Sequence, residues 1–343
     1  MIDWISASIP LRHMPIKAGH FLLFDEDGQI LSDKPISKVF KGSFESKISL
    51  RSQGAIDEQG YCDCIFINGN PAKFLQGHNV FGSDDLLGLL RGLFTELMKV
   101  SDLGIDALQI MCSVNAATIS RIDFTKSIMF ENRLQARSYI KELSMIAHTR
   151  NGRPNQKGWT LAFQATSKRW SVIVYTKGDE LATHKPNEKF QHTEYIEKQA
   201  DNLVRVELRL RTLELMRQNC RKAQQLTPSK LHQMYADFIG RIQMTTTVNV
   251  TSEEISKLTR AHQATYLLWK NGVNVQAEMT ERTYFRHLSA IKKIGVDITY
   301  PYQESSLSNV VPLKMTIKGK SYQIPEEAYQ KGLVFQPQLL RVV

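Results

Sequence analysis

Charged and nucleophilic side chains recur two residues apart in three short segments of the chain. The segments carry Arg121 and Asp123, then Tyr175 and Lys177, then Arg205, Glu207 and Arg209. Paired carboxylates bind a hard divalent cation through oxygen. A tyrosine attacks a phosphodiester when a cation polarises a phosphate oxygen and positive groups balance the charge that builds there. These residue types are therefore those of metal-assisted phosphoryl transfer.

Two of the segments have the pattern of strands that place their charges on one face. Residues 120–124 and 204–210 alternate between charged or polar and aliphatic or aromatic side chains, and residues two apart on a strand point the same way. If these strands are neighbours, Asp123 and Glu207 bind one Mg²⁺ or Mn²⁺ ion, and the flanking arginines hold phosphates or neutralise the acid pair. A solvent-exposed ladder of salt bridges is the alternative interpretation.

The third segment, residues 170–180, delivers one tyrosine to a strand end. A run of β-branched residues leads to Tyr175, and Gly178 is placed to turn the chain. A tyrosine with a solution pKa of about 10 needs a nearby cation or a base to become a nucleophile, and Lys177 can serve either the tyrosinate or the phosphate. With 11 tyrosines in the chain, ordinary packing is the competing explanation for Tyr175.

Composition favours a folded, nucleic-acid-binding protein. The chain has 343 residues, 42% hydrophobic content and a net charge of +10, which suits two domains and a polyanionic partner. Its four cysteines form no CxxC pair, so we expect a reducing, cytoplasmic setting without structural zinc. No apolar run approaches the ~18 residues of a membrane span, and the first residues do not resemble a signal peptide; we expect no membrane partner.

The order of elements predicts an α+β fold. Strands and turns fill residues 1–68, and a helix over 83–97, a strand over 117–125, a helix over 132–148, a hairpin over 159–175 and a strand over 203–210 follow. This is an antiparallel sheet with crossover helices, of the split βαβ type. Helices then dominate over 212–225, 228–242, 251–270 and 280–295. We predict a domain boundary between residues 1–222 and 223–343.

The last predicted helix carries a basic stripe. Arg282, Arg286 and Lys293 lie on one side of it, and Tyr284 and Leu288 point inward. With the extended residues 296–300 after it, a winged helix-turn-helix that contacts DNA fits this region. A solvated basic helix face is the alternative.

Five segments make the chain recognisable. They are PAKFLQGHNVFG at 71–82, VNAATISRID at 114–123, VYTK at 174–177, LVRVE at 203–207 and NVVPL at 309–313. In this order they resemble the gene II replication initiators of filamentous phages, which are rolling-circle initiators related to the HUH endonucleases. The resemblance runs from about residue 60 to 320.

The resemblance implies a nickase and strand-transferase with a HUH-like sheet. It would cut one strand of the double-stranded phage genome at the origin through a 5′-phosphotyrosine link, leave a 3′-OH for a host polymerase, and later rejoin the displaced strand. The family's nucleophile falls on Tyr175, its Arg-x-Asp and Arg-x-Glu strands on Asp123 and Glu207, and its Gly-His-Asn segment on His78. The implied partners are origin DNA, its nicked single strand, and host helicase and polymerase in the bacterial cytoplasm.

The sequence departs from the wider HUH class at the metal site. None of its nine histidines stand two apart, so carboxylates must dominate the ligand set. We predict Asp123 and Glu207 as ligands, His78 as a third ligand, Lys177 and Arg121 as catalytic partners of Tyr175, and Arg205 and Arg209 as contacts to DNA. The alternative for His78 is a loop histidine bonded to backbone or DNA. The alternative function is a non-catalytic protein that binds the origin or single-stranded DNA.

Overall fold

The computed structural model describes most of the chain. The described residues are 1–42, 44–150, 152–186, 190–244, 252–294, 296–299, 302 and 322–336. Residues 251, 295, 300 and 309–313 belong to the helices, the extended segment and the resemblance considered above, and they lie outside the described residues.

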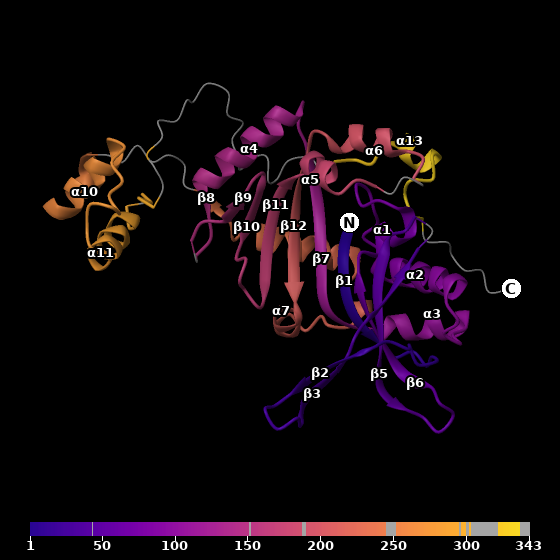
Figure 1. Ribbon diagram of the computed structural model, residues 1–343. Helices are drawn as coiled ribbons and strands as arrows, with labels where there is room; N and C mark the ends of the chain where they lie inside the picture. The colour runs from indigo at the N-terminus through magenta and orange to yellow at the C-terminus, as the bar shows by residue number, and fades with distance from the viewer. Residues whose placement is uncertain are drawn as a thin grey trace.

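A nine-stranded antiparallel sheet forms the centre of the molecule (Figure 1). In sheet order the strands are β4 (Lys38–Lys41), β5 (Lys47–Ile56), β6 (Cys62–Gly69), β1 (Ile2–Ile9), β7 (Thr118–Met129), β12 (Leu203–Arg211), β11 (Trp170–Thr176), β10 (Thr160–Phe163) and β9 (Asn155–Lys157). This arrangement confirms the predicted α+β class with a large antiparallel sheet. It also places the strands of Asp123, Glu207 and Tyr175 side by side.

One face of the sheet, here called the closed face, is apolar and covered by helices. The aliphatic positions of the alternating strands point to it and are buried, as in Ile122, Val206 and Val174. Helices bring their own apolar stripes against them in one continuous core. The covering elements are α2 (Leu86–Val100), α3 (Ala107–Asn115), α4 (Arg133–Ile146), η1 (Ala223–Gln225) and α8 (Pro228–Ile239).

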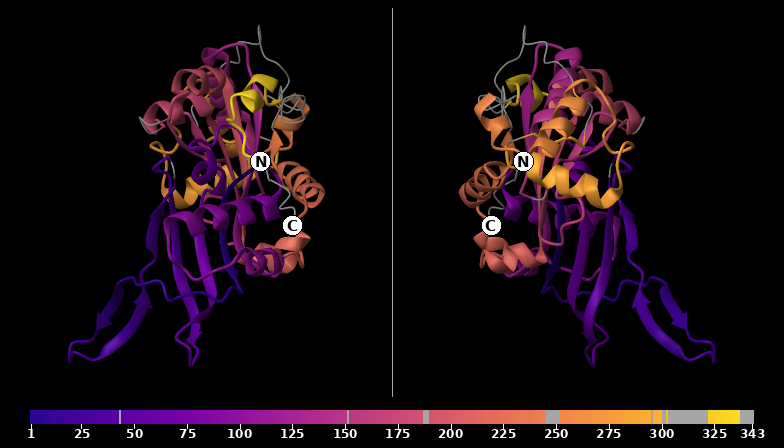
Figure 2. Two further views of the ribbon diagram at one scale, coloured as in Figure 1. Left: turned by 90° about the vertical axis from the view of Figure 1, so that its right-hand side faces the viewer. Right: turned by 90° about the vertical axis from the view of Figure 1, so that its left-hand side faces the viewer.

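The opposite, open face carries the polar positions of the same strands, and two hairpins extend beyond the body (Figures 1 and 2). One is the end of β5 and the start of β6. The other pairs β2 (His20–Phe24) with β3 (Ile30–Pro35) through the acidic turn that the sequence predicts. The five residues of β2 are all exposed, so this ribbon leaves large apolar side chains in solvent.

Short helices gather at the upper end of the strands (Figure 1). They are α1 (Pro71–Gln76), α5 (Lys177–Thr183), α6 (Thr193–Ala200) and α13 (Glu326–Gln330). Their apolar residues form a second core, in which Leu333 of the C-terminal segment packs with Phe81 and Phe190. A segment about 250 positions later in the chain than the loop 77–82 therefore closes this end of the sheet.

The chain after the sheet is helical, as predicted, but two of the predicted helices are interrupted. Residues 212–225 form α7 (Thr212–Arg217) and then η1, because Asn219 adopts a left-handed φ of 51° that ends the helix. Residues 252–270 form α9 (Ser252–Ser256) and α10 (Arg260–Lys270), since Thr259 caps a new helix by accepting from the N–H of His262. A small second sheet pairs β8 (Ala147–His148) with β13 (Gln243–Met244).

Helices α9, α10 and α11 (Glu281–Lys292) form a separate small core away from the sheet (Figure 1). Tyr284 and Ile291 of α11 are buried in it, as expected. The described residues 296–299 contain a turn and no strand, so the extended wing is not seen there. The division at residues 222 and 223 stays a prediction; α8, beyond it, packs on the closed face.

Candidate active site

The site lies on the open face where β1, β7, β12 and β11 run side by side. Strand pairing sets Asp123 opposite Arg209, Thr125 opposite Glu207, and Tyr175 opposite Arg205. Paired residues on antiparallel strands share a face. The sequence prediction that the two acid-bearing strands are neighbours is therefore confirmed, with the tyrosine on the next strand.

Two arginines saturate Asp123. Arg121 donates from Nε to Oδ1 at 2.9 Å and from Nη2 to Oδ2 at 2.5 Å, and Arg209 donates from Nε to Oδ2 at 3.0 Å. Arg209 also donates to Oε1 of Glu207 at 2.9 Å. The carboxylate is only 1% exposed, so this is a buried charge network rather than the solvent-exposed ladder considered above.

Glu207 is the site's unusual acid. It is 6% exposed, and burial, followed by the negative charges of Asp3 and Asp123, raises its pKa to about 8 against the opposing charge of Arg209. A carboxyl group held in this way exchanges a proton near neutral pH. Such a perturbation is typical of functional sites.

Tyr175 lies at the end of β11, as the sequence predicts, and is 8% exposed. Burial raises the pKa of its phenol well above 10, and the Arg205 guanidinium counteracts this, while the carboxylates of Asp3, Glu207 and Glu180 add to it. The tyrosine therefore stays a neutral phenol until a cation or a proton acceptor acts on it.

Arg205 does not have the role predicted for it. It is fully buried and donates to the carbonyl oxygens of Asn79 at 2.6 Å and Val80 at 2.8 Å. The alternating pattern correctly placed it on the face of Glu207, but the loop 77–82 covers that end of the face. Arg205 thus fixes the loop against β12 beside Tyr175, and its guanidinium is not available to DNA.

Lys177 is also buried, in the first turn of α5 rather than in a loop. Its Nζ donates to Oδ1 of Asn79 at 2.8 Å and to Oε2 of Glu180 at 2.5 Å. Burial, reinforced by the charge of Arg205, lowers its pKa to about 8. Close packing explains the neighbouring glycine, because a Cβ at Gly178 would lie 2.8 Å from the carbonyl oxygen of Asp201.

The structure does not bring His78 to the acid pair. Its Nε2 lies 2.8 Å from the carbonyl oxygen of Leu333, and its Nδ1 accepts from the N–H of Val80 at 3.3 Å. Burial lowers its pKa to about 4, so the ring is neutral. His78 is the backbone-bonded loop histidine of the alternative interpretation, and it joins the loop to the C-terminal segment.

The oxygen atoms of the site fit a hard divalent cation. Within the described ranges, no three His, Cys, Asp or Glu side chains lie together in a group that would hold a metal. The hydroxyl of Thr125, however, is buried beside Glu207 and has no hydrogen-bond partner among the described residues. A carboxylate next to an unused hydroxyl is a donor set that Mg²⁺ or Mn²⁺ accepts.

Asp3 is a residue of the site that sequence analysis missed. It sits at an irregularity of β1, between the paired positions of Ile2 and Trp4, and its Oδ1 accepts from the side-chain amides of Asn70 and Asn79 at 2.9 Å each. An isolated acid in the first strand has no neighbouring charge in sequence to mark it. The amides that hold it come from segments 67 and 76 residues away.

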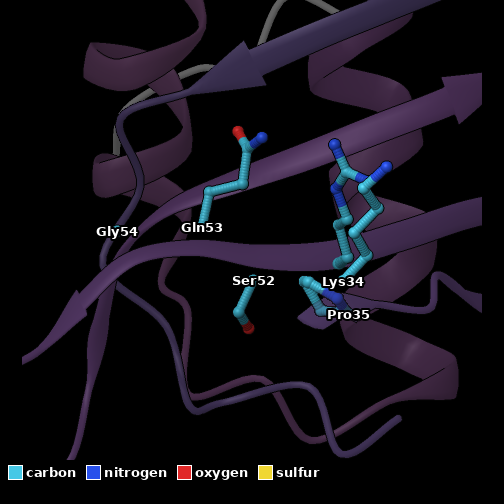
Figure 3. Close-up of a pocket in the computed structure, with 6 residues that line it drawn as sticks. Lys34, Pro35, Ser52, Gln53 and Gly54 are labelled. Atoms are coloured by element: carbon cyan, nitrogen blue, oxygen red, sulfur yellow. The ribbon is translucent and has the colours of Figure 1, made fainter. Parts of the chain in front are cut away.

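Beyond these acids the open face alternates arginines with aromatic rings. The Arg121 guanidinium lies 5.2 Å from the Trp4 ring centroid, and the Arg51 guanidinium lies 4.5 Å from that of Phe66. Next to Arg51, at the base of the β2–β3 ribbon, is a pocket of about 560 Å³. It is lined by Lys34, Pro35, Arg51, Ser52, Gln53 and Gly54 (Figure 3). It lies on β5, five strands away from Tyr175 in the sheet order.

The basic stripe of α11 is present. Arg282, Arg286 and Lys293 are exposed, and the helix begins at the cap position Thr280 as predicted. These cations lie on the separate helical core rather than on the sheet.

The fold and site together define an α+β protein whose open sheet face gathers a buried tyrosine, buried acids and arginines. Two sequence models of the replication-associated protein of phage gene II match the chain: the N-terminal model covers residues 1–229, and the C-terminal model covers residues 250–334. The chain belongs to this family of phage replication-associated proteins.

The relatives come from filamentous phages. The chain is 32% identical over 333 residues to the replication-associated protein of Enterobacteria phage I2-2, and the match covers 95% of this chain and 96% of the relative. It is 30% identical over 174 residues to that of Enterobacteria phage M13, covering 45% and 41% of the two chains. None of the helices described here is long and apolar enough to cross a membrane.

Proposed function

We propose that this protein initiates rolling-circle replication of a phage genome by nicking one strand of the double-stranded origin and later rejoining the displaced strand. Tyr175 is the nucleophile and becomes linked to the 5′-phosphate. The observation that carries the proposal is the placement of Tyr175 beside Arg205, Asp3 and Glu207, three charged groups that act on its phenol. A tyrosine that serves only packing has no use for three buried charges, each of which is costly to desolvate.

The covalent step exchanges one phosphate ester for another. The phenol oxygen of Tyr175 bonds to phosphorus, the bond from phosphorus to the 3′-oxygen breaks, and that oxygen takes up a proton as the free 3′-OH. The phenol proton goes to a neighbouring base. Lys177 is our candidate, since its pKa of about 8 leaves a part of its amine neutral under mildly alkaline conditions.

Arg205 and the site's acids have separate roles in this step. The guanidinium of Arg205 stabilises the negative charge that forms on Tyr175. Glu207 helps to hold Mg²⁺ or Mn²⁺, which when bound supplies a positive charge that polarises a phosphate oxygen. Asp123 keeps Arg121 and Arg209 at the edge of the site, where their remaining N–H groups face the DNA backbone.

The open face is the proposed path of the DNA strand. Its arginines offer contacts to phosphates, and Trp4 and Phe66 offer surfaces on which unpaired bases stack. The stripe on α11 adds contacts to the double-stranded origin. Host helicase and polymerase act on the nicked product, in the cytoplasm of the bacterial host.

A non-catalytic role in origin or single-strand binding is the second candidate. It is favoured by one observation, the saturation of Asp123 by two arginines, because a purely binding face also needs its acids neutralised. The two candidates differ in whether the phosphodiester bond breaks.

The test is incubation of the full chain with supercoiled phage DNA and Mg²⁺. We expect open circles that carry protein on the 5′ end, and Tyr175→Phe should lower their rate of formation by at least about 10⁴-fold because the nucleophile is gone. Gel electrophoresis with and without protease detects the covalent product.

Tyr61→Phe is the matched control. Tyr61 precedes β6, packs its ring against Arg12, and lies outside the site, so this variant should nick like the wild type. Normal nicking by Tyr175→Phe would exclude Tyr175 as the nucleophile, and binding without any cleavage by the wild type would favour the second candidate.

A further inference from the structure

The hydroxyl of Thr125 is a buried polar group without a partner. The residue is 1% exposed, and its Oγ1 makes no hydrogen bond to the described part of the chain. A hydroxyl left in this way costs about 1–3 kcal/mol. A threonine at this position is therefore unfavourable unless its oxygen has a ligand.

The register of the strands places this hydroxyl between two carboxylates. On one side Thr125 pairs with Glu207 of β12. On the other side its backbone N–H donates to the carbonyl oxygen of Met1 at 2.8 Å, next to the segment that carries Asp3. Thr125 and Glu207 point to the open face, and Asp3 reaches the same face through its contacts with the loop residue Asn79.

The contacts of the Asp3 carboxylate with described residues are all made by one of its oxygens. The amides of Asn70 and Asn79 both donate to Oδ1, and the 4.0 Å approach of Arg205 is also to Oδ1. Asp123 differs, because Arg121 and Arg209 occupy both of its oxygens. Of the two buried aspartates, Asp3 is thus the better placed to bind a cation directly.

The charges point to the same pair. Asp3 acts on Glu207 more strongly than Asp123 does, although Asp123 lies on the adjacent strand. Two carboxylates that repel each other in a buried place are stabilised when a divalent cation lies between them.

We infer that Asp3, Glu207 and the Thr125 hydroxyl form a divalent-cation site for Mg²⁺ or Mn²⁺, with Asp123 outside the ligand set. The inference rests on the proposed function, which requires a cation near Tyr175, and it replaces the sequence-based pair of Asp123 and Glu207. The set contains two carboxylates and one hydroxyl, so it is consistent with the lack of any three-residue His, Cys, Asp or Glu group among the described residues. Water and a phosphate oxygen complete the coordination of such an ion.

Mn²⁺ binding to the full chain tests this site without reference to nicking. Titration followed by electron paramagnetic resonance measures the free ion. We expect Asp3→Asn to weaken Mn²⁺ binding by about 10- to 100-fold and Thr125→Val by a smaller factor of about 3 to 10. The amide oxygen introduced by D3N can still accept the bonds from Asn70 and Asn79, so the loop keeps its support.

Thr125→Val protects the test against misfolding. Valine has nearly the shape of threonine and removes an unpaired hydroxyl, so the melting temperature without metal should stay the same or rise. Wild type should gain thermal stability on addition of Mn²⁺, and T125V should gain less. Asp27→Asn, in the exposed turn of the ribbon, is the charge-matched control and should bind Mn²⁺ like wild type.

The outcomes separate this inference from the proposed function. Wild-type affinity in both D3N and T125V would overturn the site, even if the wild type nicks DNA. A loss of affinity only in Asp123→Asn would return the site to the sequence-based pair. If D3N and T125V bind Mn²⁺ weakly but the wild type never cleaves DNA, the site stands and the nickase proposal fails.

Discussion

Arginine has opposite surroundings in two regions of this molecule. On β12 the side chain of Arg205 is fully buried and bonded to two backbone carbonyls, and that of Arg209 is 23% exposed and bonded to two acids. On α11, Arg282 and Arg286 stand exposed on one helix face. The first pair shapes a site from within, and the second pair presents charge to a partner.

The difference shows that charge pattern and burial must be considered together. Alternation on a strand and a stripe on a helix both select one face. Neither pattern says what lies over that face. A loop lies over Arg205, so its charge stabilises the protein's own backbone, and mutations in the two regions should affect different measurements.

The largest expected difference is in folding stability. Arg205→Met leaves the carbonyl oxygens of Asn79 and Val80 without this donor and removes a cation that lies 4.0 Å from Asp3. We expect the free energy of unfolding to fall by about 3–5 kcal/mol. Arg286→Met, with an exposed side chain, should change it by less than about 0.5 kcal/mol. Urea denaturation measures both, and equal losses would show that Arg205 is not held as described.

A pH dependence follows from the buried Lys177. Its pKa is lowered to about 8 in the folded protein from 10.5, so between these pH values the unfolded chain binds more protons and stability rises with pH. Below pH 8 both states are protonated and the penalty of burying the ammonium is constant. Relative to Lys177→Met, the wild type should gain about 2–3 kcal/mol from pH 8 to 10.5.

Parallel stability curves for the two proteins would contradict this prediction. Guanidinium denaturation at several pH values is the suitable measurement, because its high ionic strength screens the exposed charges that also titrate in this range. The buried Nζ is screened much less.

Local pattern was sufficient for the strands of the site. The two-residue spacing of Arg121 with Asp123, and of Glu207 with Arg209, predicted the face on which they meet, because a strand has a fixed period. The β-branched run likewise predicted the strand that ends at Tyr175. These features depend on a few consecutive residues, and the structure confirms each of them.

The sequence does not predict the parts of the site that depend on distant segments. The burial of Arg205 and the bond of His78 to Leu333 require the loop 77–82 and the C-terminal segment, 255 residues apart for the latter bond. Asp3 required knowledge that the first strand lies at the centre of the sheet. Its only warning in the sequence was an acid among the apolar residues Ile2, Trp4 and Ile5, a position where a buried charge needs partners.

The smallest expected effect is on DNA affinity through α11. Replacing Arg282 and Arg286 together by glutamine should weaken binding to double-stranded origin DNA by about tenfold and reduce the salt slope by roughly 2, since each cation that meets a phosphate contributes about 0.9. Cleavage of a single-stranded oligonucleotide should remain near the wild-type rate, because the sheet carries the site. The control removes the same charge from Lys257 and Arg260, which are exposed at α10. An equal loss from both pairs would mean that net charge, and not the α11 stripe, attracts the DNA.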